Sequence, residues 1–107
     1  MEFGQFAELL KKLQAEEMAL GETKGKEYVH NDDRLDNFKH LEGMIGVNAK
    51  KVCWVYLQKH LDSIMRYVKT SEVLSEDIRG RIVDARHYLA LLYGLIVEEQ
   101  EEQGEIK

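Results

Sequence analysis

With 107 residues, of which 44% are hydrophobic, the chain is long enough for one domain with a modest core and too short for two. It contains no proline, and 33% of its residues are charged, as expected for a mostly helical protein. Its net charge of −5 argues against broad, sequence-independent nucleic-acid binding, because such binding requires Lys and Arg to neutralise many phosphates.

The first predicted helix covers residues 2–20. Its apolar residues recur at the three-four spacing of one helical face, and Gly21 is expected to end it. Glu17 occupies a position of this face that should be apolar. Two interpretations remain open: Glu17 reaches water near the helix end, or it belongs to a site.

Residues 21–37 form the longest stretch without apolar periodicity, so we expect a charged loop. Lys and Arg in such a loop can bind phosphate, a tyrosine can stack on a base, and Asp or Glu can hold a hard cation. A solvated connector is the alternative. The residues that would take part are Lys24, Lys26, Glu27, Tyr28, His30, Asn31, Asp32, Asp33, Arg34, Asp36 and Asn37.

A short helix is predicted over residues 38–45, with Gly46 as its stop. Asn48 is then a suitable N-cap for a long helix over residues 49–68. The apolar stripe of this helix is Trp54, Leu57, Leu61, Ile64 and Val68. Cys53 lies on a neighbouring, half-polar stripe and is expected to pack as a small apolar group; as the single cysteine it excludes an internal disulfide.

The strongest helical pattern covers residues 75–99, with Ser75 as the expected N-cap. Its stripe steps by four and three through Ile78, Ile82, Ala85, Leu89, Leu92 and Ile96. A second face holds Asp84 among large apolar residues. A third face is made of small residues, including Gly80, Ala90 and Gly94, which would allow another helix to approach closely in an oligomer.

The last two helices are expected to form an antiparallel hairpin across the turn at residues 69–74. Pairing their stripes places Asp84 at the depth of Asp62 and within a helical turn of Lys59 and His60. A buried carboxylate needs a partner to stay charged. Lys59 or Arg81 could supply a structural ion pair, and a divalent metal could supply a site; both remain open.

Overall we predict a single all-α domain over residues 1–107. It is a helical bundle of about four helices with a long antiparallel C-terminal hairpin, and residues 100–107 form an acidic tail. Because wide apolar faces on a short chain need covering, we expect a dimer or a larger assembly. The N-terminal segment lacks the pattern of a secretory signal, and no apolar run suits a membrane span, so we expect a cytoplasmic protein.

Three strings resemble motifs of small phage and prophage proteins: KGKEYVHNDDRLDNF, VYLQKHLDSI and SEDIRGRIVDARHYLALL. These proteins are related to the nucleotide modification associated domain and, more remotely, to the MazG-type all-α nucleoside triphosphate pyrophosphohydrolases. The resemblance covers residues 26–96. It implies a MazG-like bundle and, in a phage setting, a location in the host cytoplasm.

The resemblance also implies a role in nucleotide metabolism, with Mg²⁺-dependent hydrolysis between the α- and β-phosphates as one form of it. The metal would be held by acids, namely Asp84, Glu17, Asp62 and Glu27, with Asp33 as a further candidate. Lysine, arginine, histidine and tyrosine side chains would contact the nucleotide, namely Lys26, Tyr28, Lys59, His60, Arg81 and Tyr88.

The chain departs from the MazG pattern in its acids, since Arg81 replaces a glutamate three residues before Asp84. Glu16 and Glu17 have no following third acid. Two alternatives to an enzyme therefore stay open. One is a non-catalytic module that binds or sequesters a nucleotide, and the other is a structural helical oligomer without a ligand.

Overall fold

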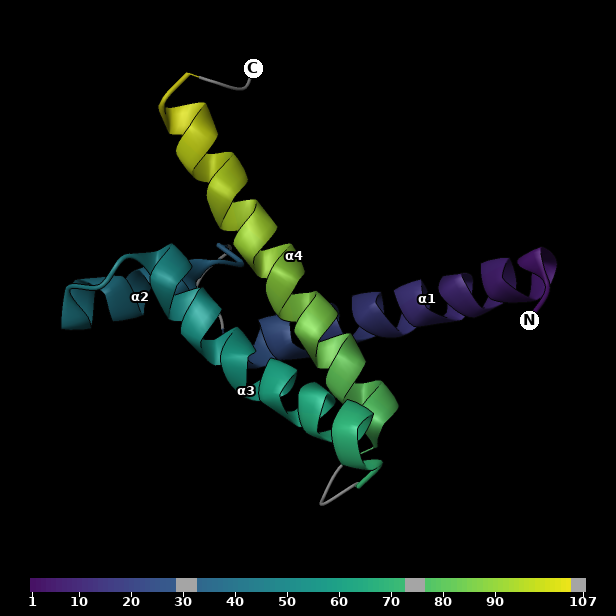
Figure 1. Ribbon diagram of the computed structural model, residues 1–107. Helices are drawn as coiled ribbons and strands as arrows, with labels where there is room; N and C mark the ends of the chain where they lie inside the picture. The colour runs from purple at the N-terminus through teal and green to yellow at the C-terminus, as the bar shows by residue number, and fades with distance from the viewer. Residues whose placement is uncertain (29–32, 73–76, 105–107) are drawn as a thin grey trace.

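Four α-helices make up the described part of the chain, as a computed structural model shows (Figure 1). The structure describes residues 1–28, 33–72 and 77–104, and the side chains of residues 25–28 lie outside this description. The helices are α1 (Phe3–Tyr28), α2 (Asp36–Ile45), α3 (Ala49–Thr70) and α4 (Ile78–Glu102). No strand occurs within these residues, so the predicted all-α class is confirmed.

Helix α1 is longer than predicted, because Gly21 lies inside it and the helix continues to Tyr28. The expected loop over residues 21–37 is therefore wrong over its first eight residues. Glycine stops a helix mainly where the chain turns into the left-handed region, and Gly21 instead packs against His87 of α4. Tertiary packing at this position outweighs the low helix propensity of glycine.

The ends of the other helices follow the predicted chemistry more closely. Gly46 ends α2 with φ of 70°, and the Asn48 side chain caps α3 by accepting a hydrogen bond from the Lys50 backbone N–H at 2.8 Å. Ser71 ends α3 in the left-handed region at φ of 58°. Asp77 caps α4 by accepting from the Arg79 N–H, whereas the predicted cap Ser75 lies outside the described residues.

Helices α3 and α4 pack as the predicted antiparallel pair, while α1 crosses α4 and its N-terminal half projects away from the other helices (Figure 1). Helix α2 packs on α3. The main core lies where α2, α3 and α4 meet, and it includes Phe38, Cys53 and Leu91. Cys53 is completely buried, which confirms that it packs as a small apolar group.

The predicted apolar stripes are not the most buried faces of α3 and α4. Trp54 and Val68 on α3, and Leu89 on α4, are exposed, whereas Leu57 and Ala85 are buried as expected. Apart from Leu57 and Ala85, the buried residues of the two helices lie beside the predicted stripes and include two histidines: Cys53 and His60 on α3, and Val83, His87, Leu91 and Leu95 on α4. Helix α4 is rotated this way because it packs against α1 as well as α3.

The small-residue face of α4 is used within the chain at one of its positions, and its predicted use in an oligomer stays a prediction. A Cβ atom added at Gly94 would lie 3.5 Å from Leu35 Cδ1, so this glycine admits a side chain of the same chain. Gly80 and Ala90 are exposed. None of the described helices combines the length and apolar character required to cross a membrane.

Candidate functional site

Two buried histidines form the centre of a polar cluster between α1, α3 and α4. His60 on α3 and His87 on α4 are each 6% exposed. Tyr88 lies between their rings: its ring stacks on His60 with centroids 5.1 Å apart, and it meets His87 edge-on at 6.0 Å. Consecutive residues of a helix point about 100° apart, so His87 and Tyr88 reach the cluster from different sides of α4.

Arg34, which precedes α2, enters this cluster and fixes the protonation state of His87. Its Nη2 lies 2.9 Å from His87 Nε2. A guanidinium only donates hydrogen bonds, so Nε2 must accept and the imidazole is neutral, with its proton on Nδ1. Burial and the nearby Arg34 charge both lower the pKa of His87, in agreement with this tautomer.

His60 has a polar atom without a hydrogen-bond partner. Its Nδ1 is buried, and the nearest carboxylate oxygen in the cluster, Oδ2 of Asp84, is 3.9 Å away, which is too far for a hydrogen bond. Burial lowers the pKa of His60, and the Asp84 charge only partly opposes this effect. A buried ring nitrogen facing a carboxylate across such a gap is suited to contact a further polar group.

Among the described residues, the cations that act on the two imidazoles outnumber the acids. Lys24, Lys59 and Arg81 lie close enough to His60 to lower its pKa electrostatically, and Arg34 does the same to His87. Asp84 opposes them at both rings, and Glu17 does so at His87. These described groups are four cations and two acids, and one of the acids, Glu17, is itself paired with a further cation, Arg86.

Glu17, whose polar nature interrupted the apolar face of α1, forms an ion pair with α4. Its Oε2 accepts a hydrogen bond from Arg86 Nε at 2.8 Å, and both side chains are partly buried. Glu17 therefore holds α1 against α4 beside the cluster. Of its two predicted roles, reaching open water at the helix end is wrong, because α1 continues for eleven residues after Glu17.

The structure brings several of the predicted site residues together and leaves others apart. His60, Tyr88 and Asp84 meet in the cluster, with Lys59 and Arg81 in electrostatic range. Asp62 is exposed on α3. The side chains of Lys26, Glu27 and Tyr28 lie outside the described residues, although their backbone belongs to α1.

Sequence reasoning missed Arg34 and His87 as members of the site. Arg34 appeared only as one of many charged residues in the expected loop, and His87 replaced the asparagine of the resembling motif. The usable signal was that a histidine lay at helical spacing among small residues that pack closely. That spacing indicates burial, but it does not reveal which cation will meet the ring.

The acids of the described residues do not assemble a metal site by themselves. Across the described ranges, no three His, Cys, Asp or Glu side chains lie together in a way that could hold a metal ion. Glu17 is engaged by Arg86, and Asp84 faces His60. Of the four predicted Mg²⁺ ligands, Asp84 lies in the cluster and Glu17 pairs with Arg86. Asp62 is exposed on α3, and the Glu27 side chain lies outside the described residues.

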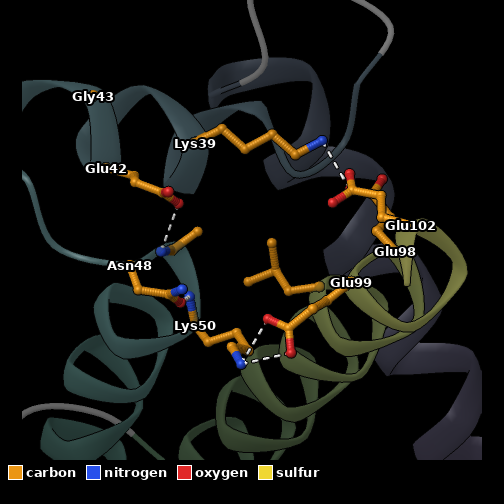
Figure 2. Close-up of a pocket in the computed structure, with 10 residues that line it drawn as sticks. Lys39, Glu42, Gly43, Asn48, Lys50, Glu98, Glu99 and Glu102 are labelled. Carbon is orange, nitrogen blue, oxygen red and sulfur yellow. Dashed lines mark hydrogen bonds and ion pairs between the residues drawn. The ribbon is translucent and has the colours of Figure 1, made fainter.

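A second polar region, lined by α2, α3 and the end of α4, surrounds a cavity of about 440 Å³ (Figure 2). Lys39 binds Glu98 at 2.9 Å and Lys50 binds Glu99 at 2.7 Å. Lys39 also pairs with Asp33, and these bonds lower the pKa of Asp33 and raise that of Lys39. Each lysine here has carboxylate partners, so this region fastens α2 and α3 to α4.

Comparison with protein-family models, curated proteins and solved structures finds no match to this chain. The resemblance to phage nucleotide proteins therefore stays a prediction from the three sequence motifs.

Proposed function

We propose that this chain binds a nucleotide, and that the polar cluster around His60 and His87 receives its phosphate groups. The observation that carries the proposal is Arg34, a partly buried cation whose hydrogen-bond partner is a neutral imidazole. Burial lowers the pKa of Arg34, which means that its charge is held at a cost. An anionic ligand would supply the charge that His87 does not.

The surrounding groups suit a phosphate. A guanidinium offers planar, paired donors that match phosphate oxygens, and lysines add positive charge without a fixed direction. Arg34 would contact the phosphate directly, while Lys24, Lys59 and Arg81 would attract it. His60 Nδ1, which lacks a partner, would complete the polar contacts.

Of the two nucleotide-related functions, the described residues suit a phage-type module that binds a nucleotide better than they suit a Mg²⁺-dependent hydrolase. Hydrolysis with Mg²⁺ requires carboxylates that converge on the metal, and the described acids do not provide three. The resemblance still makes cleavage between the α- and β-phosphates worth testing. Its readout is the release of pyrophosphate, which binding alone would not produce.

Binding is tested by thermal shift of the purified chain with nucleoside mono-, di- and triphosphates, in ribo and deoxy forms, with and without Mg²⁺. A ligand that binds only the folded protein raises its Tm. We expect a shift that grows with the number of phosphates and needs no metal. A shift only with Mg²⁺, together with pyrophosphate release, would support the hydrolase, and the absence of any shift would refute nucleotide binding.

Arg34→Gln is the variant that tests the site. A hydrogen bond to a charged group contributes about 1.5–3 kcal/mol, so we expect the Kd to rise at least tenfold. Arg66→Gln is the matched control, because Arg66 is an exposed arginine near the end of α3 that pairs with Glu72. Equal affinity of the two variants would show that the phosphates bind elsewhere.

A further inference from the structure

The N-terminal half of α1 carries an apolar stripe that no described part of the chain covers. This half extends beyond the other helices (Figure 1). Phe3 is 98% exposed, Phe6 is 56% exposed and Leu9 is 46% exposed. The helix nevertheless begins with a formed cap, because the Gln5 side chain accepts a hydrogen bond from the Glu2 N–H at 2.8 Å.

An apolar groove lies at the base of the same stripe, where α1 crosses the start of α4. Its walls are Leu9 and Leu13 from α1 and Ile82 from α4, and its volume is about 280 Å³. The rim carries three charged residues, Lys12, Glu16 and Arg79. One chain thus carries both a pair of exposed aromatic side chains, Phe3 and Phe6, and an open apolar groove that begins further along the same helix, at Leu9.

We propose that this surface binds a second copy of the chain, with the two α1 helices antiparallel about a two-fold axis. Phe3 of each copy enters the groove of the other, and Phe6 packs on the apolar stripe beside that groove. Phe3 precedes Leu13 by ten residues, or about 15 Å along the helix. An antiparallel pair centred near residue 8 therefore places Phe3 of one copy beside Leu13 of the other, and Phe6 beside Leu10. The contact is isologous, as in most dimers.

The size of the contact is adequate for a specific interface. A phenylalanine that becomes fully covered removes about 150–250 Å² of surface from water. Phe3 is 98% exposed and Phe6 is 56% exposed, so the two rings of each copy can bury about one and a half times this area. The surface that they cover on the partner contributes a comparable area. The total is on the order of 1,000 Å², where specific interfaces begin.

Helix stability gives an independent reason for a covering partner. Isolated helices shorter than about 12–15 residues are marginal in water, and most helical stability in proteins comes from packing an apolar face. The part of α1 before its crossing with α4 has such a face and packs on no other described helix. Pairing with a second α1 supplies the missing packing.

The proposal is tested by sedimentation velocity of the full chain over a range of concentrations, without nucleotide. We expect a reversible dimer, and we expect Phe6→Asp to weaken it at least tenfold. Met18→Asp is the control, since Met18 is also exposed on α1 but lies off the stripe. Circular dichroism shows that each variant is folded. A wild-type monomer at all concentrations, or equal weakening by the two variants, would overturn the proposal.

Discussion

The two buried histidines are paired differently, and this difference determines what each can do. His87 accepts a hydrogen bond from Arg34 and has Gly21 of α1 against its ring. His60 stacks on Tyr88, and its Nδ1 has no hydrogen-bond partner. His87 is therefore a structural acceptor that orients a cation, while His60 is the ring with a free polar atom.

The stability of the protein should fall as the pH drops below neutrality. Burial lowers the pKa of both His60 and His87 from the ordinary value of 6.5. Below pH 6.5 the unfolded chain therefore binds more protons than the folded one, and the free energy of unfolding decreases with falling pH. Urea unfolding at pH 7.5 and pH 5.5 measures this. Equal stability at the two values would contradict the neutral state of the buried rings.

Replacing each histidine by phenylalanine should give opposite results at pH 7.5. His60→Phe keeps a ring beside Tyr88 and removes the unpaired nitrogen, so we expect the ligand-free protein to be equally or more stable, by up to about 1 kcal/mol. His87→Phe removes the acceptor of Arg34, so we expect a loss of about 1–3 kcal/mol. Urea unfolding compares the two. A larger loss for His60→Phe would reverse the assigned roles.

At the scale of the elements, the sequence predicts the helices better than it predicts which faces pack together. Gly46 and Asn48 mark helix ends through local chemistry, namely a left-handed backbone and a side-chain cap. Gly21 carries the same local signal as Gly46, but a distant contact with His87 decides its conformation. Local signals therefore predict boundaries only where no tertiary contact competes.

The two glycines give a test of this distinction. A Cβ atom at Gly21 would meet His87 Cε1 at 3.5 Å, which is an ordinary contact inside a helix. We therefore expect Gly21→Ala to stabilise the protein by about 0.5–1 kcal/mol. Gly46→Ala should destabilise it by about 1–2 kcal/mol, because the φ of 70° is unfavourable for alanine although the space is open.

Thermal and urea unfolding of the two glycine variants measure these changes. Destabilisation by Gly21→Ala would mean that α1 and α4 are packed more tightly at the cluster than the structure shows.

The candidate site could be predicted only in part for the same reason. His60, Asp84 and Tyr88 lie on α3 and α4, whose antiparallel pairing follows from two adjacent helical patterns and a short turn. Arg34 and Glu17 depend on how α1 and the segment before α2 lie over α4. Periodicity in one helix does not contain that information, because it describes a face and not the partner of that face.

At the scale of the whole molecule, the helices form an open arrangement that leaves apolar side chains on its surface. The extents are 43 × 31 × 26 Å, and exposed apolar residues occur on every helix. The predicted apolar stripes of α3 and α4, like the apolar stripe of α1, are partly exposed to solvent. A single chain of this length does not cover all the apolar faces that its sequence provides.

The proposed dimer predicts that heat stability depends on protein concentration. Association of folded chains stabilises them by mass action, so the Tm should rise when the concentration is raised a hundredfold. In the Phe6→Asp variant, whose dimer is weaker, the Tm should rise less over the same range of concentration. Calorimetry or circular dichroism at several concentrations measures both. A constant Tm for the wild type would argue that the folded state is monomeric.

The crossing of α1 over α4 also has a consequence for the order of folding. Helices α3 and α4 are neighbours in the chain and can meet after closing a short turn, whereas the Glu17–Arg86 pair joins residues 69 positions apart. Contacts between distant residues form late, because the loop that they close costs more entropy. The hairpin should therefore form first, and the polar cluster should be completed only when α1 docks in the last step.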